Sequence, residues 1–276
     1  MNLGSYGVWG HSRALTTQRA RELESLGFGT LWQGGSPEAG LQHARDLLAA
    51  TSTVVVATGI VNIWTADATA VAASYHEIEA AHPGRFLLGV GVGHPEATAE
   101  YRSPYQMLVD YLDVLDGEGV PAERRVLAAL GPKVLRLARD RSAGAHPYLV
   151  TPEHSRTARE ILGPDRLLAP EQRVVLEADP AAARAIGRPT VVKPYLGLTN
   201  YTTNLRRLGY TDDDLSGEGS DHLIDDLVVY GDGATVARRL GEHLEAGADH
   251  VAVQLLTNSD GELDAQYRRL AEAILA

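Results

Sequence analysis

Three glycines at alternate positions lead to a histidine in the segment LLGVGVGHPE, a pattern that could serve chemistry. Gly89, Gly91 and Gly93 would leave one face of a strand without side chains, so that a flat ligand could lie against the backbone. His94 could act there as a general acid or donate a hydrogen bond to a ring. The spacing is not G-x-G-x-x-G, so it does not predict a dinucleotide site. Tight packing of small residues would require the same glycines, and both interpretations stay open.

A second candidate site begins at Gly131-Pro132, where a helix is predicted to start directly after a strand. Free backbone N–H groups at such a position can bind a phosphate, helped by the helix dipole. The same dipeptide also opens helices that bind nothing. The other histidines do not form an H-E-x-x-H motif, and no serine lies in a G-x-S-x-G turn, so the sequence does not indicate a zinc protease or a serine hydrolase.

The elements that must position these residues alternate between short apolar runs and longer helical patterns. The strand candidates are Tyr6–Trp9, Thr30–Trp32, Thr53–Thr58, Phe86–Val90, Arg125–Ala129, His146–Val150, Arg173–Leu176 and His250–Gln254. The helices predicted between them include Ala68–Ala81, Pro132–Arg141 and Pro152–Leu162. Eight alternating units predict a parallel (β/α)₈ barrel, with a doubly wound open sheet as the alternative. In a barrel the active site lies at the carboxyl ends of the strands.

One stretch, about 187–230, interrupts this alternation before the last strand. It carries Pro189 and Pro194, a long helical pattern and a cluster of acidic residues without EF-hand spacing. We interpret it as an inserted set of helices and a solvated loop, which could cover a substrate as a lid. No low-complexity linker divides the chain, so 1–276 is predicted to form a single domain.

The amino-acid composition excludes several classes of ligand. The chain has 25 Lys and Arg against 36 Asp and Glu, a formal net charge of −11. Binding to nucleic acid or to an anionic membrane is therefore not expected, because both require clustered positive charge. The chain has no cysteine, which excludes disulfides, thiolate nucleophiles and cysteine metal sites. With no signal peptide pattern and no apolar run long enough to span a bilayer, we expect a cytoplasmic protein acting on a small molecule.

Several segments resemble the bacterial luciferase-like monooxygenase family, and more narrowly its actinobacterial branch that uses the deazaflavin coenzyme F420. They include VVVATGIVNIWTADATAVAASYHEIEAAHPGRFLLGVGVGHPE, TPEH and YLGLTNY. The P-G-R-F-x-L-G-x-G pattern is typical of the family, whereas TPEH and YLGLTNY are typical of the subgroup. The resemblance extends over essentially the whole chain.

The resemblance implies a (β/α)₈ barrel with a non-prolyl cis peptide between Gly59 and Ile60, behind the central ring of the deazaflavin. The backbone around Leu130 would hold the coenzyme phosphate, and His94 would face the reacting centre. The implied coenzyme-binding residues are Gln33, Gly34, Thr58, Gly59, Ile60, Gly91, Val92, Gly93, Ala129, Leu130, Gly131 and Pro132.

The chain departs from several F420-dependent relatives, which place an Asp-His pair after the second strand. Here the segment WQGGS at 32–36 has neither residue. We therefore take His94 and His11 as the candidate catalytic residues, although His11 could equally well bind nearby backbone. Trp9, Trp64 and Tyr195 are candidates for the substrate wall, and each could instead be simple core.

Three functions follow as hypotheses. The first is an oxidoreductase that passes a hydride between coenzyme F420 and a small organic substrate, with the protein supplying orientation and a proton donor. The second is a monooxygenase that uses reduced FMN and oxygen on the same fold. The third, suggested by the missing Asp-His pair, is a deazaflavin- or flavin-binding protein without catalytic activity. Members of this family are usually dimers, so a homodimer is expected.

Overall fold

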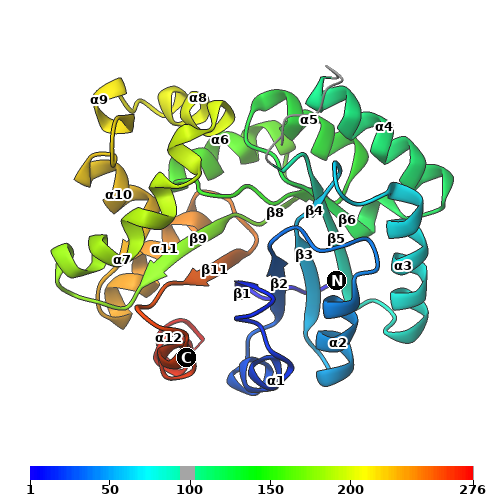
Figure 1. The fold of residues 1–276 in the computed structure, drawn as a ribbon, viewed down its shortest axis with the longest axis horizontal. Coiled ribbons are helices and arrows are strands. Elements are labelled where there is room, and N and C mark those ends of the chain that lie inside the picture. The colour runs from blue at the N-terminus through cyan, green and yellow to red at the C-terminus, as the bar shows by residue number, and fades with distance from the viewer. Residues whose placement is uncertain (94–102, 276) are drawn as a thin grey trace.

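The strands form one curved parallel sheet surrounded by helices (Figure 1). The computed structural model describes residues 1–93 and 103–275. The strands are β1 (Tyr6–His11), β2 (Thr30–Gly34), β3 (Val55–Gly59), β4 (Val61–Asn62), β5 (Phe86–Gly91), β6 (Arg125–Leu127), β7 (Gly144–Ala145), β8 (Leu167–Leu168), β9 (Glu171–Val175), β10 (Val228–Tyr230) and β11 (Val251–Leu255).

The segment 167–175 closes this sheet into a barrel. Its first part, β8, pairs with β7, and its second part, β9, pairs with β11, which in turn pairs with β1. Backbone bonds continue the ladders between these parts, from the Ala169 amide to the Ala145 carbonyl at 2.9 Å and from the Ala252 amide to the Pro170 carbonyl at 2.8 Å. The predicted (β/α)₈ barrel is confirmed, and the open doubly wound sheet is not what the chain forms.

Apolar runs account for the strands because both faces of a barrel strand are buried. β3 and β5 follow this rule, with every residue from Val55 to Thr58 and from Phe86 to Gly91 buried. The helices are α1 (Thr17–Leu26), α2 (Gln42–Ala50), α3 (Ala68–Ala81), α4 (Pro104–Gly117), α5 (Pro132–Arg141), α6 (Pro152–Leu162), α7 (Pro180–Val192), α8 (Thr199–Arg207), α9 (Asp212–Leu215), α10 (Asp221–Leu227), α11 (Gly233–Glu245) and α12 (Leu263–Ile274). Side-chain caps such as Asp67 on α3 begin several of them. No helix in the described ranges is long and apolar enough to cross a membrane.

Helices α7 to α10 follow β9 and gather on one side of the barrel, at the left of Figure 1. They share a separate hydrophobic cluster that includes Val191, Leu205 and Leu223. Two of the acidic residues that the sequence places here bind Arg184 of α7, Asp221 at 2.7 Å and Asp225 at 2.6 Å. This part of the acidic stretch therefore holds the inserted helices together.

The strand predicted at His146–Val150 is wrong. The structure places β7 two residues earlier, at Gly144–Ala145, and the chain keeps backbone hydrogen bonds to the neighbouring strands only as far as Pro147, whose carbonyl accepts from the Glu171 amide at 2.8 Å. Pro147 has no N–H to donate to a neighbouring strand, and Leu149 adopts a left-handed backbone with φ of 55°. This bend turns His146 and Tyr148 toward the barrel mouth, where both border a cavity.

Buried histidines connect the barrel strands through their ring nitrogens. His250 donates from Nδ1 to the Gly4 carbonyl at 2.7 Å and accepts from Trp32 Nε1 at 3.0 Å. The Trp32 ring stacks on His146, with centroids 4.1 Å apart, and His146 Nδ1 donates to the Ala169 carbonyl at 2.6 Å. Burial lowers the pKa of His146 and of His250 to about 4, so both are neutral at physiological pH.

We expect the protein to lose stability as the pH falls from 7 to 5. Burial also lowers the pKa of His243, to about 3, so the unfolded chain takes up protons at His146, His243 and His250 in this interval and the folded chain does not. Each histidine should cost about 2 kcal/mol of unfolding free energy. Burial raises the pKa of Glu171 to about 7, so the folded chain takes up a proton there as the pH falls. This stabilises the fold and offsets the destabilisation from about one histidine.

Urea unfolding at several pH values measures this dependence. The variant His250→Asn removes one of these groups. Its loss of unfolding free energy between pH 7 and pH 5 should be about 2 kcal/mol smaller than that of the wild type, whatever its absolute stability. Stability that rises on acidification, or an unchanged slope in the variant, would contradict the assignment.

Candidate active site

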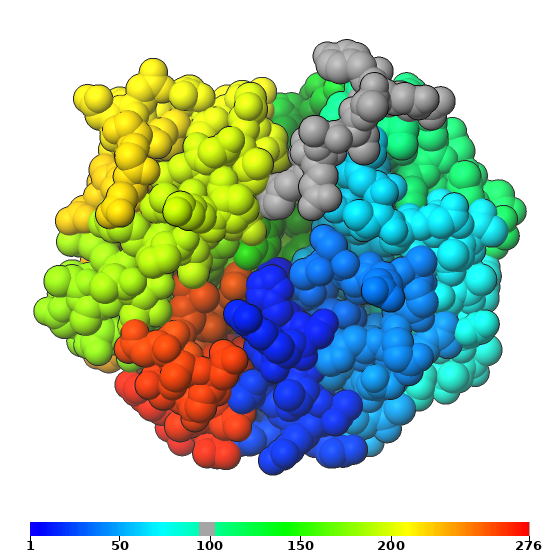
Figure 2. Space-filling model, in the orientation of Figure 1, coloured from blue at the N-terminus to red at the C-terminus, as the bar shows by residue number. Residues whose placement is uncertain are grey.

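A cavity of about 1260 Å³ opens at the carboxyl ends of the barrel strands. It is bordered by the ends of β1 and β3, the segments after β5, β6 and β7, the middle of β9, and the α7–α8 region. Figure 2 shows the surface hollowed between the yellow-green segment around α8 and the blue and cyan N-terminal half. This is the face on which barrels of this kind build their active sites.

The floor of the cavity depends on two glycines that lie against Trp9. A Cβ at Gly34 would lie 2.1 Å from the indole, and a Cβ at Gly59 would lie 2.8 Å from Trp9 Nε1. The indole N–H donates to the Gly59 carbonyl at 3.3 Å. The peptide between Gly59 and Ile60 is cis, which confirms the position implied by the family resemblance. The floor is therefore flat backbone and one aromatic ring.

His146 borders the cavity beside this floor and was not among the candidate residues predicted from the sequence. Its Nδ1 is used by the Ala169 carbonyl, so Nε2 carries the lone pair. Nε2 is buried, has no hydrogen-bond partner among the described residues, and would lie 3.1 Å from a Cβ at Gly59. It can accept one hydrogen bond from a ligand. The feature of the sequence that could have pointed to His146 is its place directly after a short barrel strand.

His11 ends β1 and is exposed at the mouth of the cavity. Its ring meets Trp9 edge-on at 5.0 Å, and Gly35 passes so close that a Cβ there would lie 2.9 Å from His11 Nδ1. Partial burial lowers the pKa of His11, and the charges of Arg13 and Arg173 lower it further. At neutral pH the imidazole is therefore mainly neutral and able to take up a proton.

A polar network forms the wall on the side of β9 and β11. Arg173 donates from Nη2 to the Tyr148 hydroxyl at 3.1 Å, and that hydroxyl donates to Gln254 Oε1 at 2.8 Å. Glu171 lies on the same strand, with Oε1 4.0 Å from Arg173 Nε. Burial alone would lower the pKa of Arg173, but Tyr148 and Glu171 raise it, so the guanidinium stays charged.

The rim holds the start of α5. Gly131 is the N-cap residue of this helix, and no side chain caps it. The loop before it is fixed by His154, whose Nε2 donates to the Leu130 carbonyl at 2.9 Å. Arg207, at the end of α8, brings Nη1 to 3.4 Å from a Cβ position at Gly131. A free helix start beside a guanidinium is suited to an anionic group.

The predicted site residues divide into three groups. Those that border the cavity are Trp9, His11, Gly59, Ile60, Val92, Gly93, Ala129, Leu130, Gly131 and Tyr195. Those that do not border it are Gln33, Gly34, Thr58, Trp64, Gly91 and Pro132. His94 lies outside the described residues. The functional roles assigned to all of them stay predictions.

The residues behind the cavity wall have structural contacts of their own. Thr58 is buried and exchanges hydrogen bonds with the Gly89 backbone at 2.8 Å, which joins β3 to β5. Gln33 is buried and donates to Ser12 at 3.3 Å. Trp64 packs against the main hydrophobic core. These contacts support the strands that present Gly59.

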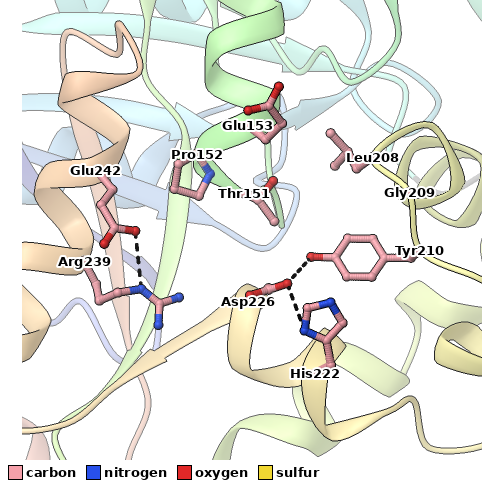
Figure 3. A pocket seen from close by; sticks show the side chains of 10 residues that line it. All are labelled: Thr151, Pro152, Glu153, Leu208, Gly209, Tyr210, His222, Asp226, Arg239 and Glu242. Atoms are coloured by element: carbon pink, nitrogen blue, oxygen red, sulfur yellow. Dashed lines mark hydrogen bonds and ion pairs between the residues drawn. The ribbon is translucent and has the colours of Figure 1, made fainter.

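A second pocket of about 320 Å³ lies between α6, the turn at 208–210, α10 and α11 (Figure 3). Tyr210 donates to Asp226 at 2.7 Å, and His222 Nδ1 lies 3.5 Å from the same carboxylate. Arg239 pairs with Glu242 at 3.5 Å. The second pocket shares no lining residue with the larger cavity, and its charged side chains already have partners, such as Glu153 with Arg156 at 3.3 Å, so we do not place the active site there.

We expect the variant Gly34→Ala to destabilise the protein by about 1–3 kcal/mol, because the added methyl group overlaps the Trp9 ring and forces it to move. Urea unfolding measures the loss, and tryptophan emission reports the displaced indole. Gly40→Ala is the matched control, since nothing lies within 4 Å of that Cβ position. Equal effects of the two substitutions would show that Trp9 does not rest on Gly34.

Residues 5–118 match the model of the luciferase-like monooxygenase family. Among curated proteins, no sequence matches the chain. Solved structures with the same fold include an F420-dependent secondary alcohol dehydrogenase in complex with an F420-acetone adduct, with a TM-score of 0.75, 15% identity and 98% of each chain covered. The F420-dependent tetrahydromethanopterin reductase of Methanopyrus kandleri has a TM-score of 0.69, 16% identity and 98% of each chain covered.

A flavin-containing structure is similar to nearly the same extent. The oxygenating component of 3,6-diketocamphane monooxygenase from Pseudomonas putida, in complex with FMN, has a TM-score of 0.68, 12% identity and 98% of each chain covered. At these sequence identities the similarity to the solved structures shows a shared fold. The family match over residues 5–118, together with the fold shared along the whole chain, confirms the resemblance to the luciferase-like monooxygenase family.

Proposed function

We propose that the protein is an oxidoreductase that transfers a hydride between coenzyme F420 and a small organic substrate. The observation that carries this proposal is the floor at Gly59, where Trp9 and His146 leave no room for a side chain, beneath a cavity large enough for a tricyclic ring and a substrate. Two of the solved structures described above are F420-dependent enzymes, which supports it further.

The residues present fit a deazaflavin. Its flat ring would lie against the Gly59–Ile60 backbone, where a side chain is excluded by Trp9 and His146. The unpartnered Nε2 of His146 would accept a hydrogen bond from a ring N–H or a hydroxyl group of the coenzyme. The backbone from Leu130 to Pro132 would hold its phosphate at the start of α5.

The bound coenzyme would supply hydride chemistry at its C5 carbon. The protein would contribute orientation, exclusion of water and a proton acceptor. His11 suits the last role, because its lowered pKa keeps Nδ1 or Nε2 free to take the hydroxyl proton of an alcohol as the substrate is oxidised. His94 stays the other candidate for proton transfer, and the wall of Trp9 and Tyr195 would contact the apolar part of the substrate.

An FMN-dependent monooxygenase is the second candidate, favoured by the likeness to an FMN complex. A fluorescence titration of the purified protein with coenzyme F420 and, separately, with FMN distinguishes the two. We expect micromolar or tighter binding of F420 and weaker binding of FMN. Preference for FMN, together with oxygen consumption when reduced FMN is supplied, would replace the proposal by the monooxygenase. Binding without turnover over a panel of alcohols, enones and imines would indicate an inactive binding protein.

We expect His11→Ala and His94→Ala each to lower turnover while coenzyme affinity stays within several-fold of the wild type. General acid–base groups typically contribute about 10²–10⁴-fold to the rate. Steady-state kinetics with a secondary alcohol and F420, alongside the binding titration, separates the two effects. His222→Ala is the matched control, because this histidine is exposed beside the second pocket. Unchanged turnover in either variant would remove that residue from the mechanism.

We also propose a homodimer, as expected for this family. Light scattering on the purified protein gives the mass in solution, and the 29.6 kDa chain makes a monomer and a dimer easy to distinguish. A mass of one chain at micromolar concentration would contradict the dimer.

A further inference from the structure

Arg173 is a buried cation that borders the cavity. It lies in the middle of β9, its side chain is 2% exposed, and its guanidinium carbon lies 5.2 Å from the ring centroid of Tyr148 and 4.9 Å from that of Tyr195. Nη2 donates to the Tyr148 hydroxyl at 3.1 Å, whereas Nε and Nη1 have no hydrogen-bond partner in the described parts of the chain. Leaving charged donors unpaired in a protein interior is costly, which indicates that a ligand completes their bonding.

Glu171 does not complete the bonding of this cation. Its Oε2 accepts from the Leu149 amide at 3.0 Å, and its Oε1, 4.0 Å from Arg173 Nε, has no hydrogen-bond partner among the described residues. Burial raises the pKa of Glu171 to about 7, against the lowering effects of Arg173 and the Leu149 amide. At neutral pH the carboxyl group therefore neutralises Arg173 only in part, and positive charge is left at the cavity wall.

The other residues that border the cavity with a permanent charge are also positive. Arg173, Lys193 and Arg207 border it, while no Asp or Glu does so among the described residues. This contrasts with the formal net charge of −11 on the whole chain. A concave site of one sign concentrates ligands of the opposite sign.

We propose that Arg173 anchors a small organic carboxylate as the substrate of this cavity. One carboxylate oxygen accepts from Arg173 Nη1, and the apolar part of the substrate lies against the rings of Tyr148, Tyr195 and Trp9. A charge-assisted bond formed away from water is strong enough to select an anion over its neutral analogue. The proposal rests on the proposed function in one respect, that the anion is the molecule oxidised or reduced, and its binding is measured apart from coenzyme binding.

The test uses benzoate and benzamide, which have nearly the same shape and differ in charge. The full-length protein is titrated with each at constant ionic strength, with and without coenzyme F420, and quenching of tryptophan fluorescence reports binding because Trp9 borders the cavity. We expect benzoate to bind at least about tenfold more tightly than benzamide, as one charge-assisted bond of ordinary strength implies. Equal affinities would overturn the proposal.

Two near-isosteric variants should move benzoate affinity in opposite directions. Gln254→Glu places a carboxylate beside Tyr148 and the Arg173 charge, and should abolish the preference for benzoate over benzamide. Glu171→Gln removes the counter-ion and should tighten benzoate binding several-fold, with benzamide unchanged. These variants keep the shape of the wall, so they remain informative if Arg173→Gln fails to fold. A shift in the same direction in both would overturn the proposal.

Further arginine variants locate the anion. Arg207→Gln tests the rim, and Arg136→Gln, an exposed position on α5 that does not border the cavity, is the control for loss of one positive charge. We expect benzoate affinity to survive both substitutions within about threefold. If Arg207→Gln abolishes benzoate binding and Gln254→Glu has no effect on it, the anion binds at the rim, and the role of Arg173 is overturned. Failure of F420 to bind, with benzoate selectivity retained, would refute the proposed function and leave the anion site standing.

Discussion

The close approach of Trp9 to two glycines determines the floor of the cavity. Because a Cβ at Gly34 would lie 2.1 Å from the indole and one at Gly59 would lie 2.8 Å from its nitrogen, neither position can carry a side chain without moving the ring. The indole in turn bonds to the Gly59 carbonyl, beside the cis peptide to Ile60. One aromatic ring from β1 therefore packs against the carboxyl ends of β2 and β3, and the surface above them stays flat and open.

Around this floor the protein buries polar groups in two different electrostatic states. The histidines are neutral, since each has one ring nitrogen donating to a backbone carbonyl or an amide oxygen and burial disfavours the second proton. Arg173 stays charged, because the Tyr148 hydroxyl and the Glu171 carboxyl group lie close to it. The result is a wall that carries positive charge next to a floor that carries none. Such a division is suited to a site that takes a flat ring on one side and a polar substrate on the other.

The inserted helices supply much of the rest of the cavity. Tyr195 and Lys193 come from the segment between α7 and α8, and Arg207 comes from the end of α8. These residues are kept in place by the hydrophobic cluster of the insertion and by ion pairs such as Arg184 with Asp225 at 2.6 Å. The acidic stretch thus has a structural part in the site, because it fixes the helices that bring aromatic rings and positive charge to the barrel mouth.

The barrel could be predicted from the sequence, since buried strands need continuous apolar runs and helices begin at caps and prolines. The bounds of Ala68–Ala81 and Pro132–Arg141 were predicted correctly for that reason. The resemblance also located the cis peptide at Gly59–Ile60. Only the tertiary structure placed His146, Tyr148 and Arg173 at the cavity, and it moved β7 ahead of the segment predicted as a strand. Periodicity reports which residues are buried, whereas the pairing of β8 and β9 with different strands, and the cavity that results, depend on contacts between residues far apart in the chain.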